Sequence, residues 1–296
     1  MSQVSFVKCQ ENTLGSIKQA ILDSLDLIGY SFPSGIESVV IKPNMCYYWD
    51  YSTGQTTDPK FVGALIDLLR EKISSDVKIS VVESDASAMK CRYAFGLLGY
   101  EKLASDYKVD LVNLTEDESE SVKISVGGVD FDISVPQTIR SADLCIGVPK
   151  IKYMAQVKVS AAMKNLFGCN PMELKYKLHS KLDEAIVALA KVMKFDLHIL
   201  DGLMLYGAFT RRLDLVMASV DPVALDVAAF RIAGENSGGI RYIDLAEKEG
   251  LGSSHYVSKG LDPATFEKQF PRKPFKNKFI AFVYNTGVKI GLFEGE

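Results

Sequence analysis

The chain has 296 residues, 47% of them hydrophobic and 24% charged, with a formal net charge of −3 and a pI near 5.8. This composition is that of a folded globular protein, and its acidic balance argues against nucleic-acid binding, because domains that coat phosphate backbones are usually basic. No secretory leader is evident, and the most apolar helical stretch, residues 223–233, is too short to span a bilayer, so we expect a cytoplasmic protein with no membrane partner.

Strand and helix patterns alternate through the first part of the chain. Apolar, β-branched runs predict strands, whereas apolar residues at three- and four-residue spacing predict helices. The expected strands are residues 4–8, 38–42, 77–83 and 111–114, and the expected helices run from 12 or 13 to 28, from 59 to 70 and through 88–107.

A predicted hairpin interrupts this alternation. Residues 122–126 and 129–135 flank Gly127-Gly128, a two-residue turn signal. The alternation then resumes, with strands at 144–148, 197–201 and 215–219, helices at 157–167, 181–193, from 222 and from about 240, an irregular segment 252–277 and a last strand at 278–284.

This order of elements predicts an α/β fold with a mostly parallel, doubly wound sheet and helices on both faces. The hairpin around 122–135 is then an insertion. We expect a single α/β unit over residues 1–296, with two lobes divided near 115–143 as the alternative.

The cysteines and histidines give no metal-ligand pattern. The five cysteines are scattered and form no C-x-x-C pair, so their spacing predicts neither a zinc site nor an iron–sulfur cluster. Reduced, mostly buried thiols are the expectation. None of the three histidines pairs with a second ligand at metal-binding spacing, and no metal site is predicted.

A basic segment stands out in this acidic chain. Residues 150–194 contain nine lysines and three acids, so the segment carries +6 and the rest of the chain −9. Clustered charge focuses the electric field and indicates an anionic ligand. The alternative is a solvated lysine face on two helices. His179 lies within the segment and is a candidate acid or base.

Polar residues follow four of the predicted strands. In parallel sheets ligands bind beyond the carboxyl ends of the strands, so these residues are expected to form a charged crevice, although ordinary loop polarity is the alternative. The four strand ends read Lys42-Pro43-Asn44, Glu83-Ser84-Asp85, Lys150-Ile151-Lys152 and Asp201-Gly202.

Two further segments offer candidate ligand-binding groups. Asp58 and Asp221, each followed by proline, are expected to cap helices. That role explains Asp58 and leaves Thr56 and Thr57 as the better candidates for binding an anion at the helix start. Lys164 and Asn165 are unusually polar for a segment that continues into Leu166-Phe167-Gly168.

Taken in order, these segments resemble the family named domain of unknown function 362 (DUF362). The resemblance covers about residues 36–252 and rests on Val40-Ile41-Lys42-Pro43-Asn44, Thr56-Thr57-Asp58-Pro59, Val82-Glu83-Ser84, Val148-Pro149-Lys150-Ile151-Lys152, Met163-Lys164-Asn165-Leu166-Phe167-Gly168, Ile199-Leu200-Asp201-Gly202 and Asp221-Pro222-Val223-Ala224-Leu225-Asp226. It implies an α/β protein of undetermined activity, in a family where many members carry a ferredoxin-like cluster domain.

The chain departs from that family pattern at three places. It lacks the cysteine runs of a cluster domain. Tyr153-Met154 stands where the family usually has Thr-His, and residues 203–212 contain no acid where relatives usually have a Gly-rich stretch with a glutamate. The resemblance therefore implies a similar ligand without requiring the same reaction.

Two functions fit these observations. The first is an enzyme that binds a small phosphate- or carboxylate-bearing metabolite. The residues expected to hold its anionic group are Lys42, Lys150, Lys152 and Lys164, and the further ligand-binding residues are Asn44, Thr56, Thr57 and Asn165. The candidates for the acid or base are Glu83, Asp201 and His179. The second is a non-catalytic binding or accessory protein that contacts a redox partner. The sequence identifies no cofactor, and a homo-oligomer fits both functions.

Overall fold

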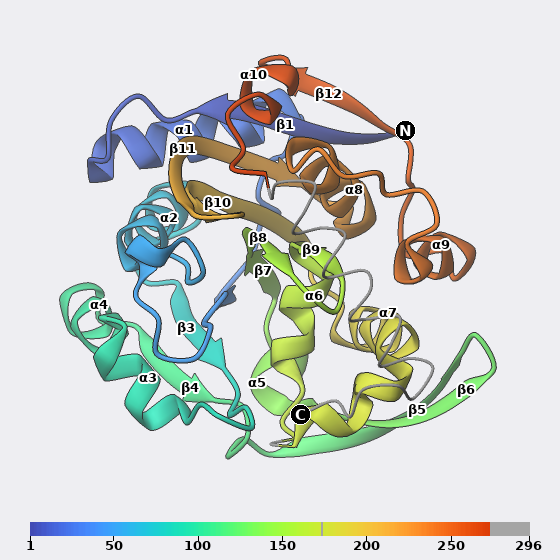
Figure 1. Ribbon diagram of the computed structural model, residues 1–296. Coiled ribbons are helices and arrows are strands. Elements are labelled where there is room, and N and C mark those ends of the chain that lie inside the picture. Colours follow the sequence, from blue (N-terminus) through green and yellow to red (C-terminus); the bar gives the residue numbers. More distant parts are fainter. Residues whose placement is uncertain (173, 273–296) are drawn as a thin grey trace.

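The computed structural model describes residues 1–172 and 174–272 (Figure 1). Its centre is a ten-stranded sheet in the order β12-β1-β11-β10-β7-β2-β3-β4, with β8 paired to β10 and β9 paired to β8. The strands of this sheet are β1 (Ser2–Lys8), β2 (Ser38–Pro43), β3 (Lys78–Glu83), β4 (Asp110–Asn113), β7 (Leu144–Val148), β8 (Lys150–Met154), β9 (Lys158–Ser160), β10 (Leu197–Tyr206), β11 (Thr210–Ser219) and β12 (Tyr256–Gly260).

The sheet is mostly parallel, which confirms the predicted fold class. Strands β10, β7, β2, β3 and β4 are parallel neighbours, whereas β11 runs antiparallel to both β10 and β1. Strand β7, which follows residues 115–143 in the chain, lies between β2 and β10, so segments from before and after that region are neighbours in one sheet.

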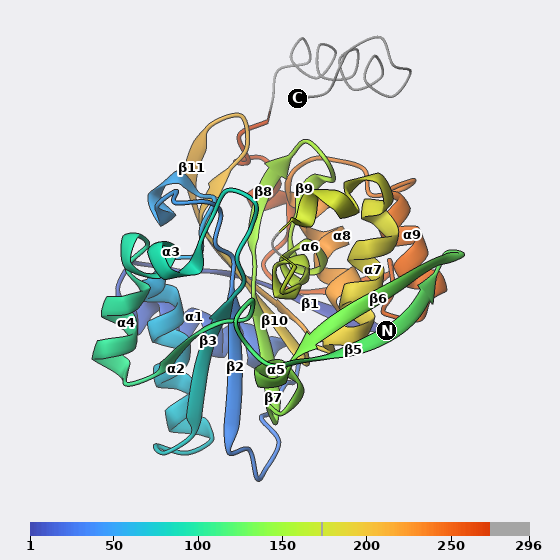
Figure 2. The same ribbon diagram turned by 90° about the horizontal axis from the view of Figure 1, so that it is seen from below.

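Helices cover both faces of the sheet (Figure 2). One face carries α1 (Leu14–Leu27), α2 (Pro59–Lys72), α3 (Cys91–Leu97) and α4 (Tyr100–Tyr107); the other carries α6 (Ala162–Leu166), α7 (Leu182–Met193), α8 (Pro222–Ile232) and α9 (Arg241–Lys248). Strand β2 contributes to both cores, because Val39 and Ile41 pack toward one face and Val40 toward the other. Such double burial explains the three consecutive apolar residues in the middle of the strand.

The predicted hairpin forms as a separate two-stranded sheet. Strands β5 (Ser119–Val126) and β6 (Val129–Pro136) pair in antiparallel register and lie against α7 (Figure 2). Gly127 and Gly128 make the turn with φ angles of 58° and 80°, a conformation that glycine adopts without strain. A short helix, α5 (Gln137–Arg140), returns the chain to β7.

The predicted helix over residues 157–167 is wrong. Residues 150–160 instead form a β-hairpin in which β9 pairs with β8, with Lys152 opposite Ser160, and only the short helix α6 follows. The short apolar pattern of Val157 and Val159 fits either a helix or a strand, so the tertiary contacts decide between them. Here both side chains are buried in the core. Lys158, with a φ of 62°, interrupts any continuous helix.

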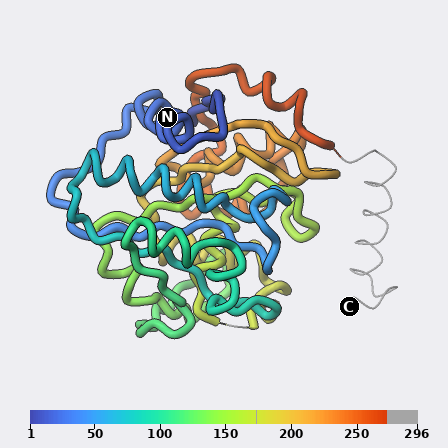
Figure 3. The backbone as a smooth tube through the Cα atoms, turned by 90° about the vertical axis from the view of Figure 1, so that its left-hand side faces the viewer, coloured from blue at the N-terminus to red at the C-terminus, as the bar shows by residue number. Residues whose placement is uncertain are grey.

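Two other expectations need adjustment. The helical region 88–107 is two helices, because Gly99 takes a φ of 83° between α3 and α4. The segment 252–277 is not wholly irregular: it contains β12 and α10 (Ala264–Glu267), and β12 lies alongside β1, so the blue and red ends of the described chain are neighbours (Figure 3). The predicted strand 278–284 lies outside the described residues.

Local capping follows the sequence closely. Thr13 caps α1, and Asp58 and Asp221 cap α2 and α8 by accepting hydrogen bonds from backbone N–H groups of the first turn, as predicted.

None of the helices within residues 1–172 and 174–272 combines the length and the apolar character needed to cross a membrane.

Candidate functional site

A cavity of about 290 Å³ lies at the carboxyl ends of β2 and β3. We call it the lysine cavity, because four lysines from separate segments line it. Its polar and aromatic lining comprises Lys42, Asn44, Cys46, Tyr47, Glu83, Ser84, Ser87, Lys152, Gln156, Ser160, Lys164, Asn165, Phe167, Lys175, Tyr176 and His179. The cavity therefore contains residues of β2, β3, β8, α6 and the 3-10 segment Lys175–Lys181.

An ion pair forms one wall of the cavity. Lys42 Nζ donates to a carboxylate oxygen of Glu83 at 2.7 Å and to the carbonyl oxygen of Pro43 at 2.6 Å. The same Glu83 carboxylate accepts from the backbone N–H groups of Met45 at 3.3 Å and Ser84 at 3.0 Å. Glu83 is thus held as a fixed, hydrogen-bonded carboxylate that keeps Lys42 paired.

A second network joins β8 to the loop after β2. Lys152 Nζ donates to Asn44 Oδ1 at 2.6 Å and to the carbonyl oxygen of Gln55 at 2.9 Å. Asn44 Nδ2 donates to Asn165 Oδ1 at 3.2 Å, and Asn165 Nδ2 donates to the carbonyl oxygen of Lys42 at 3.0 Å. The two asparagines therefore position the lysines and connect α6 to the sheet.

Lys164 and Lys175 complete the cationic lining. Lys164 Nζ lies 3.7 Å from the centroid of the Phe167 ring, a cation–π contact within the same short helix region. Lys175 Nζ donates to the hydroxyl of Ser84, which in turn donates to the carbonyl oxygen of Gly168. Neither lysine forms an ion pair with a carboxylate of the described residues.

The crowding of buried lysines lowers their proton affinity. Burial lowers the pKa of Lys164 to about 7, and the charges of Lys175, Lys152 and Lys42 act in the same direction. Burial likewise lowers the pKa of Lys175 to about 8, and it lowers the pKa of Lys152. Burial and the charge of Lys164 lower the pKa of His179, which lines the mouth of the cavity.

Lys150 and Asp201 form a second buried ion pair outside this cavity. Their Nζ and Oδ2 atoms are 3.0 Å apart, and both side chains are almost fully buried. Asp201 also accepts from the backbone N–H groups of Asp58 and Leu203. These groups face a separate hollow of about 20 Å³ beside Tyr51. Burial and the Asp201 charge raise the pKa of Asp58 to about 6.

The two threonines act on the loop rather than on the cavity. Thr57 Oγ1 accepts from the backbone N–H of Asn44 and donates to the carbonyl oxygen of Val148, both at 2.8 Å. Thr56 Oγ1 accepts from the backbone N–H of Cys46 at 3.3 Å. Both side chains are completely buried and line neither hollow, so they hold the 44–57 loop in place.

The structure thus divides the predicted site residues into groups. Lys42, Asn44, Glu83, Lys152, Lys164, Asn165 and His179 meet at the lysine cavity, Lys150 and Asp201 form a separate pair, and Thr56 and Thr57 brace the loop. Sequence reasoning did not select Lys175 or Ser84. Lys175 was present in the basic segment, but nothing distinguished it from Lys177, which is exposed.

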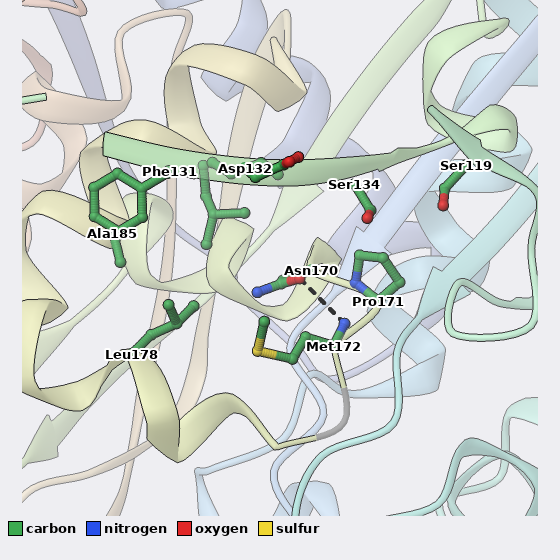
Figure 4. Close-up of a pocket in the computed structure, with 11 residues that line it drawn as sticks. Ser119, Phe131, Asp132, Ser134, Asn170, Pro171, Met172, Leu178 and Ala185 are labelled. Atoms are coloured by element: carbon green, nitrogen blue, oxygen red, sulfur yellow. Dashed lines mark hydrogen bonds between the residues drawn. The ribbon is translucent and has the colours of Figure 1, made fainter. Parts of the chain in front are cut away.

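A second cavity, of about 270 Å³, lies beneath the inserted hairpin (Figure 4). Phe131, Ala185 and Leu178 line one side, and Asn170 accepts a hydrogen bond from the backbone N–H of Met172 on the other. Asp132 is the one ionisable residue among its described lining. This cavity has far less capacity for acid–base chemistry than the lysine cavity.

Comparison with known proteins agrees with this arrangement of segments. The family described as "Domain of unknown function (DUF362)" matches residues 39–231, about two thirds of the chain. The chain belongs to the DUF362 family. The matched region contains all the predicted site residues, including both ion pairs and the lysine cavity.

A curated relative and a solved structure extend the comparison. The Thylakoid-associated protein sll1697 of Synechocystis sp. (strain ATCC 27184 / PCC 6803 / Kazusa) is 26% identical over 287 residues, covering 92% of this chain and 84% of the relative. The lactate racemase apoprotein from Thermoanaerobacterium thermosaccharolyticum is similar with a TM-score of 0.48 and 9% identity, covering 79% of this chain. This chain spans 57% of that structure.

The structure also locates the departures from the usual DUF362 pattern. Met154, at the position where the family usually has histidine, lines the lysine cavity, whereas the Tyr153 hydroxyl donates to the carbonyl oxygen of Ala233 at 3.1 Å. Residues 203–212 form the end of β10, the start of β11 and the turn between them. None of them is in the cavity lining, although Tyr206 pairs with Lys152, which is. Of these two departures, the one at Met154 therefore lies in the cavity lining.

The cysteines are all free thiols, and most are buried. Burial raises the pKa of Cys169 to about 12 and raises the pKa of Cys145 further, so both favour the neutral thiol. Cys46, which is half-buried, lines the lysine cavity. Among the described residues, no three His, Cys, Asp or Glu side chains are grouped in a way that suits a metal ion.

Proposed function

We propose that this protein is an enzyme that binds a small anionic metabolite, bearing a carboxylate or a phosphate, in the lysine cavity. One observation carries the proposal: Lys152, Lys164 and Lys175 converge on the cavity, and none of them forms an ion pair with a carboxylate of the described residues. Lys42 differs, because Glu83 already balances its charge.

The energetics of these lysines favour an anionic ligand. Removing an ammonium group from water is costly unless an opposite charge or hydrogen-bond acceptors replace the lost solvent. The lowered pKa values of Lys164, about 7, and Lys175, about 8, express that cost. A bound anion would favour the protonated forms and would stabilise the folded chain through binding linkage.

The dimensions of the cavity favour a small ligand. Its volume of about 290 Å³ lies just below the usual range for small-molecule sites, roughly 300–1,000 Å³. The aromatic side chains of Tyr47 and Tyr176 are partly exposed at its lining. A short metabolite therefore suits the cavity better than a polymer.

The proposed catalytic groups are those that exchange protons near neutral pH. Efficient acid–base catalysis requires a pKa close to the working pH, and Lys164 and His179 line the cavity with pKa values lowered toward or below that range. Glu83 is engaged by Lys42, and Asp201 faces the separate small hollow. We therefore assign Glu83 a positioning role and place Asp201 outside the reaction.

A non-catalytic accessory role in a redox system is the second candidate. The replacement of the family's usual histidine by Met154 in the cavity lining favours it, because one acid–base group is lost there. Iron and acid-labile sulfide analysis of protein purified without oxygen, together with turnover assays, separates the two. Stoichiometric iron and sulfide would favour electron transfer, whereas turnover of an anionic substrate would establish the enzyme.

Thermal unfolding with added anions tests the binding proposal directly. We expect sulfate, phosphate and malonate to raise the Tm of the parent protein, and Lys175→Met to abolish most of that rise. Lys177→Met is the matched control, because Lys177 lies in the same 3-10 segment but is exposed and outside the cavity lining. Equal protection of the parent and both variants would contradict anion binding in the lysine cavity.

A further inference from the structure

Lys164 differs from the other three lysines of the cavity in what its ammonium group contacts. Within the described part of the chain its Nζ has an aromatic ring, that of Phe167 at 3.7 Å, and no oxygen acceptor. Lys164 is partly buried and lines the lysine cavity. The amine is therefore available to a ligand.

The other three lysines are each held by oxygen acceptors. Lys42 binds Glu83 and a backbone carbonyl, Lys152 binds Asn44 and a backbone carbonyl, and Lys175 binds the hydroxyl of Ser84. An ammonium group with oxygen acceptors remains a cation that can hold an anion. A desolvated amine beside other cations is instead activated as a nucleophile.

We propose that Lys164 forms a Schiff base with the carbonyl carbon of a 2-oxo acid whose carboxylate is held by Lys152 and Lys175. This inference rests on the proposed anion binding and specifies the substrate class. In a 2-oxo acid the carboxylate and the reactive carbonyl are joined by a single bond. In the lysine cavity, Lys152 and Lys175 would hold the carboxylate while the amine of Lys164 reacts with the adjacent carbonyl carbon.

The reaction balances without a further reagent. The neutral Nζ of Lys164 attacks the carbonyl carbon, the C=O π electrons move to oxygen, and a proton passes from nitrogen to that oxygen to give a carbinolamine. The C–O bond then breaks as the nitrogen lone pair forms C=N, and the oxygen leaves as water with a second proton. His179 lines the same cavity and can carry these protons.

The charge environment keeps Lys164 reactive at neutral pH. Burial and the neighbouring charges of Lys175 and Lys152 place its pKa near 7, so a substantial fraction of the amine is neutral where an exposed lysine is almost entirely protonated. The same two neighbours are the cations proposed to bind the carboxylate. Lys152 and Lys175 would therefore both activate the Lys164 amine and orient the substrate.

Borohydride trapping tests the proposal on the full-length protein. The protein is incubated with pyruvate or 2-oxoglutarate, sodium borohydride is added to reduce the imine to a secondary amine, and intact mass and peptide mapping locate the adduct. We expect one adduct per chain on Lys164, absent in Lys164→Arg and unchanged in Lys177→Arg. Folding of each variant is checked by its melting curve. In the parent, the adduct yield should rise several-fold between pH 6 and pH 8.

The outcomes distinguish this inference from the anion-binding proposal. Malonate has two carboxylates and no ketone, so it should protect thermally and compete with trapping without forming an adduct. Malonate protection with no adduct from either oxo acid, or with adducts spread over exposed lysines, would overturn the Schiff base and leave anion binding intact. An adduct that persists in Lys164→Arg would overturn the assignment to Lys164. Absence of both protection and trapping would reject both proposals.

Discussion

Lys42 donates a hydrogen bond to Glu83 at 2.7 Å, and this ion pair joins the carboxyl ends of the neighbouring strands β2 and β3. The two side chains are only 1% and 3% exposed. Because Glu83 also accepts two backbone N–H groups, the pair fixes the loop that begins after β2. The geometry of the lysine cavity therefore depends on a charge pair that does not itself need to react.

Breaking this pair should strongly destabilise the protein. Lys42→Met leaves the Glu83 carboxylate buried and unpaired, and removal of one partner of a buried pair typically costs about 3–5 kcal/mol. Adding Glu83→Gln should restore part of the loss, because the uncompensated charge is then gone. Urea denaturation measures both. Lys102→Ala, which breaks the exposed Lys102–Asp106 pair, is the control and should change stability by less than about 0.5 kcal/mol. A similarly small effect of Lys42→Met would show that the pair is unimportant.

Gly168 allows the chain to pass directly against the same ion pair. A Cβ atom at this position would lie 2.9 Å from Glu83 Oε1 and 3.0 Å from Lys42 Nζ. We expect Gly168→Ala to destabilise the fold by about 1–3 kcal/mol, the usual cost of overpacking, and to weaken thermal protection by malonate.

Gly15 provides a matched control for the Gly168 substitution. It lies in α1 with nothing within 4 Å of its hypothetical Cβ, so Gly15→Ala should stabilise the chain by roughly 0.4–1 kcal/mol. Calorimetric melting of the two variants compares them. If Gly168→Ala were as stable as Gly15→Ala and retained full malonate protection, the close approach would have no role.

The sequence predicted the α/β framework because the signals involved are local. A buried parallel strand such as 38–42 contains an uninterrupted apolar run, Val39-Val40-Ile41, and Asp58 followed by Pro59 is a strong local signal for a helix start. The hairpin 150–160 was missed because its pairing, Lys152 opposite Ser160, depends on contacts made across the turn and on packing against β10. Such contacts do not appear in a local helical or strand period.

The candidate site was only partly predictable for the same reason. Strand order brings Lys42 and Glu83 to one edge, and the polar ends of their strands indicated this. Lys150 and Lys152 are two residues apart, so the alternation of a regular strand would place both side chains on the same side of β8. The pairing of β8 with β10 shifts register between them, and Lys152 lines the lysine cavity whereas Lys150 lines the small hollow beside Tyr51. The sequence does not reveal this irregularity. Lys175 could not be separated from its exposed neighbour Lys177, because both lie in one short 3-10 segment without a periodic burial pattern.

Asp226 should make stability depend on pH. It is completely buried in α8, accepts from Tyr242 Oη at 2.9 Å and from the Met163 N–H at 3.3 Å, and burial raises its pKa to about 7. A raised carboxyl pKa means that the folded chain holds the proton more tightly than the unfolded chain. This contribution is therefore fully present below about pH 4 and is lost as the pH rises toward 7.

Replacing Asp226 by asparagine tests that dependence. In the parent, deprotonation of Asp226 should lower the free energy of unfolding by up to about 4 kcal/mol between pH 4 and pH 8. Asp226→Asn should lack this decrease. Urea denaturation across this range is the measurement. Asp130→Asn, in the exposed part of the hairpin, should leave the pH profile of the parent unchanged. Identical profiles for the parent and Asp226→Asn would argue against a proton on buried Asp226.

Anion affinity should fall as the pH rises through the pKa values of the cavity lysines. Burial lowers the pKa of Lys164 from 10.5 to about 7 and that of Lys175 to about 8, so both lose their charge at a pH where exposed lysines keep it. Without ligand, the lysines of the unfolded chain hold their protons more tightly than the same lysines in the folded chain. The contribution of these lysines to the free energy of unfolding therefore rises with pH between about 7 and 10.5. A bound anion favours the charged forms and opposes the change.

Calorimetric titration with malonate, which is mostly the dianion throughout this range, follows this loss of charge. Between pH 6.5 and pH 9 we expect the affinity of the parent for malonate to fall by about tenfold or more, since tenfold corresponds to only about 1.4 kcal/mol. Lys164→Met should bind malonate more weakly at pH 6.5 and show a shallower pH dependence, because one of the two titrating ammonium groups is gone. Lys177→Met should reproduce the steep profile of the parent, since Lys177 is exposed and outside the cavity lining. A parent affinity that stays constant from pH 6.5 to pH 9 would mean that neither Lys164 nor Lys175 holds the anion.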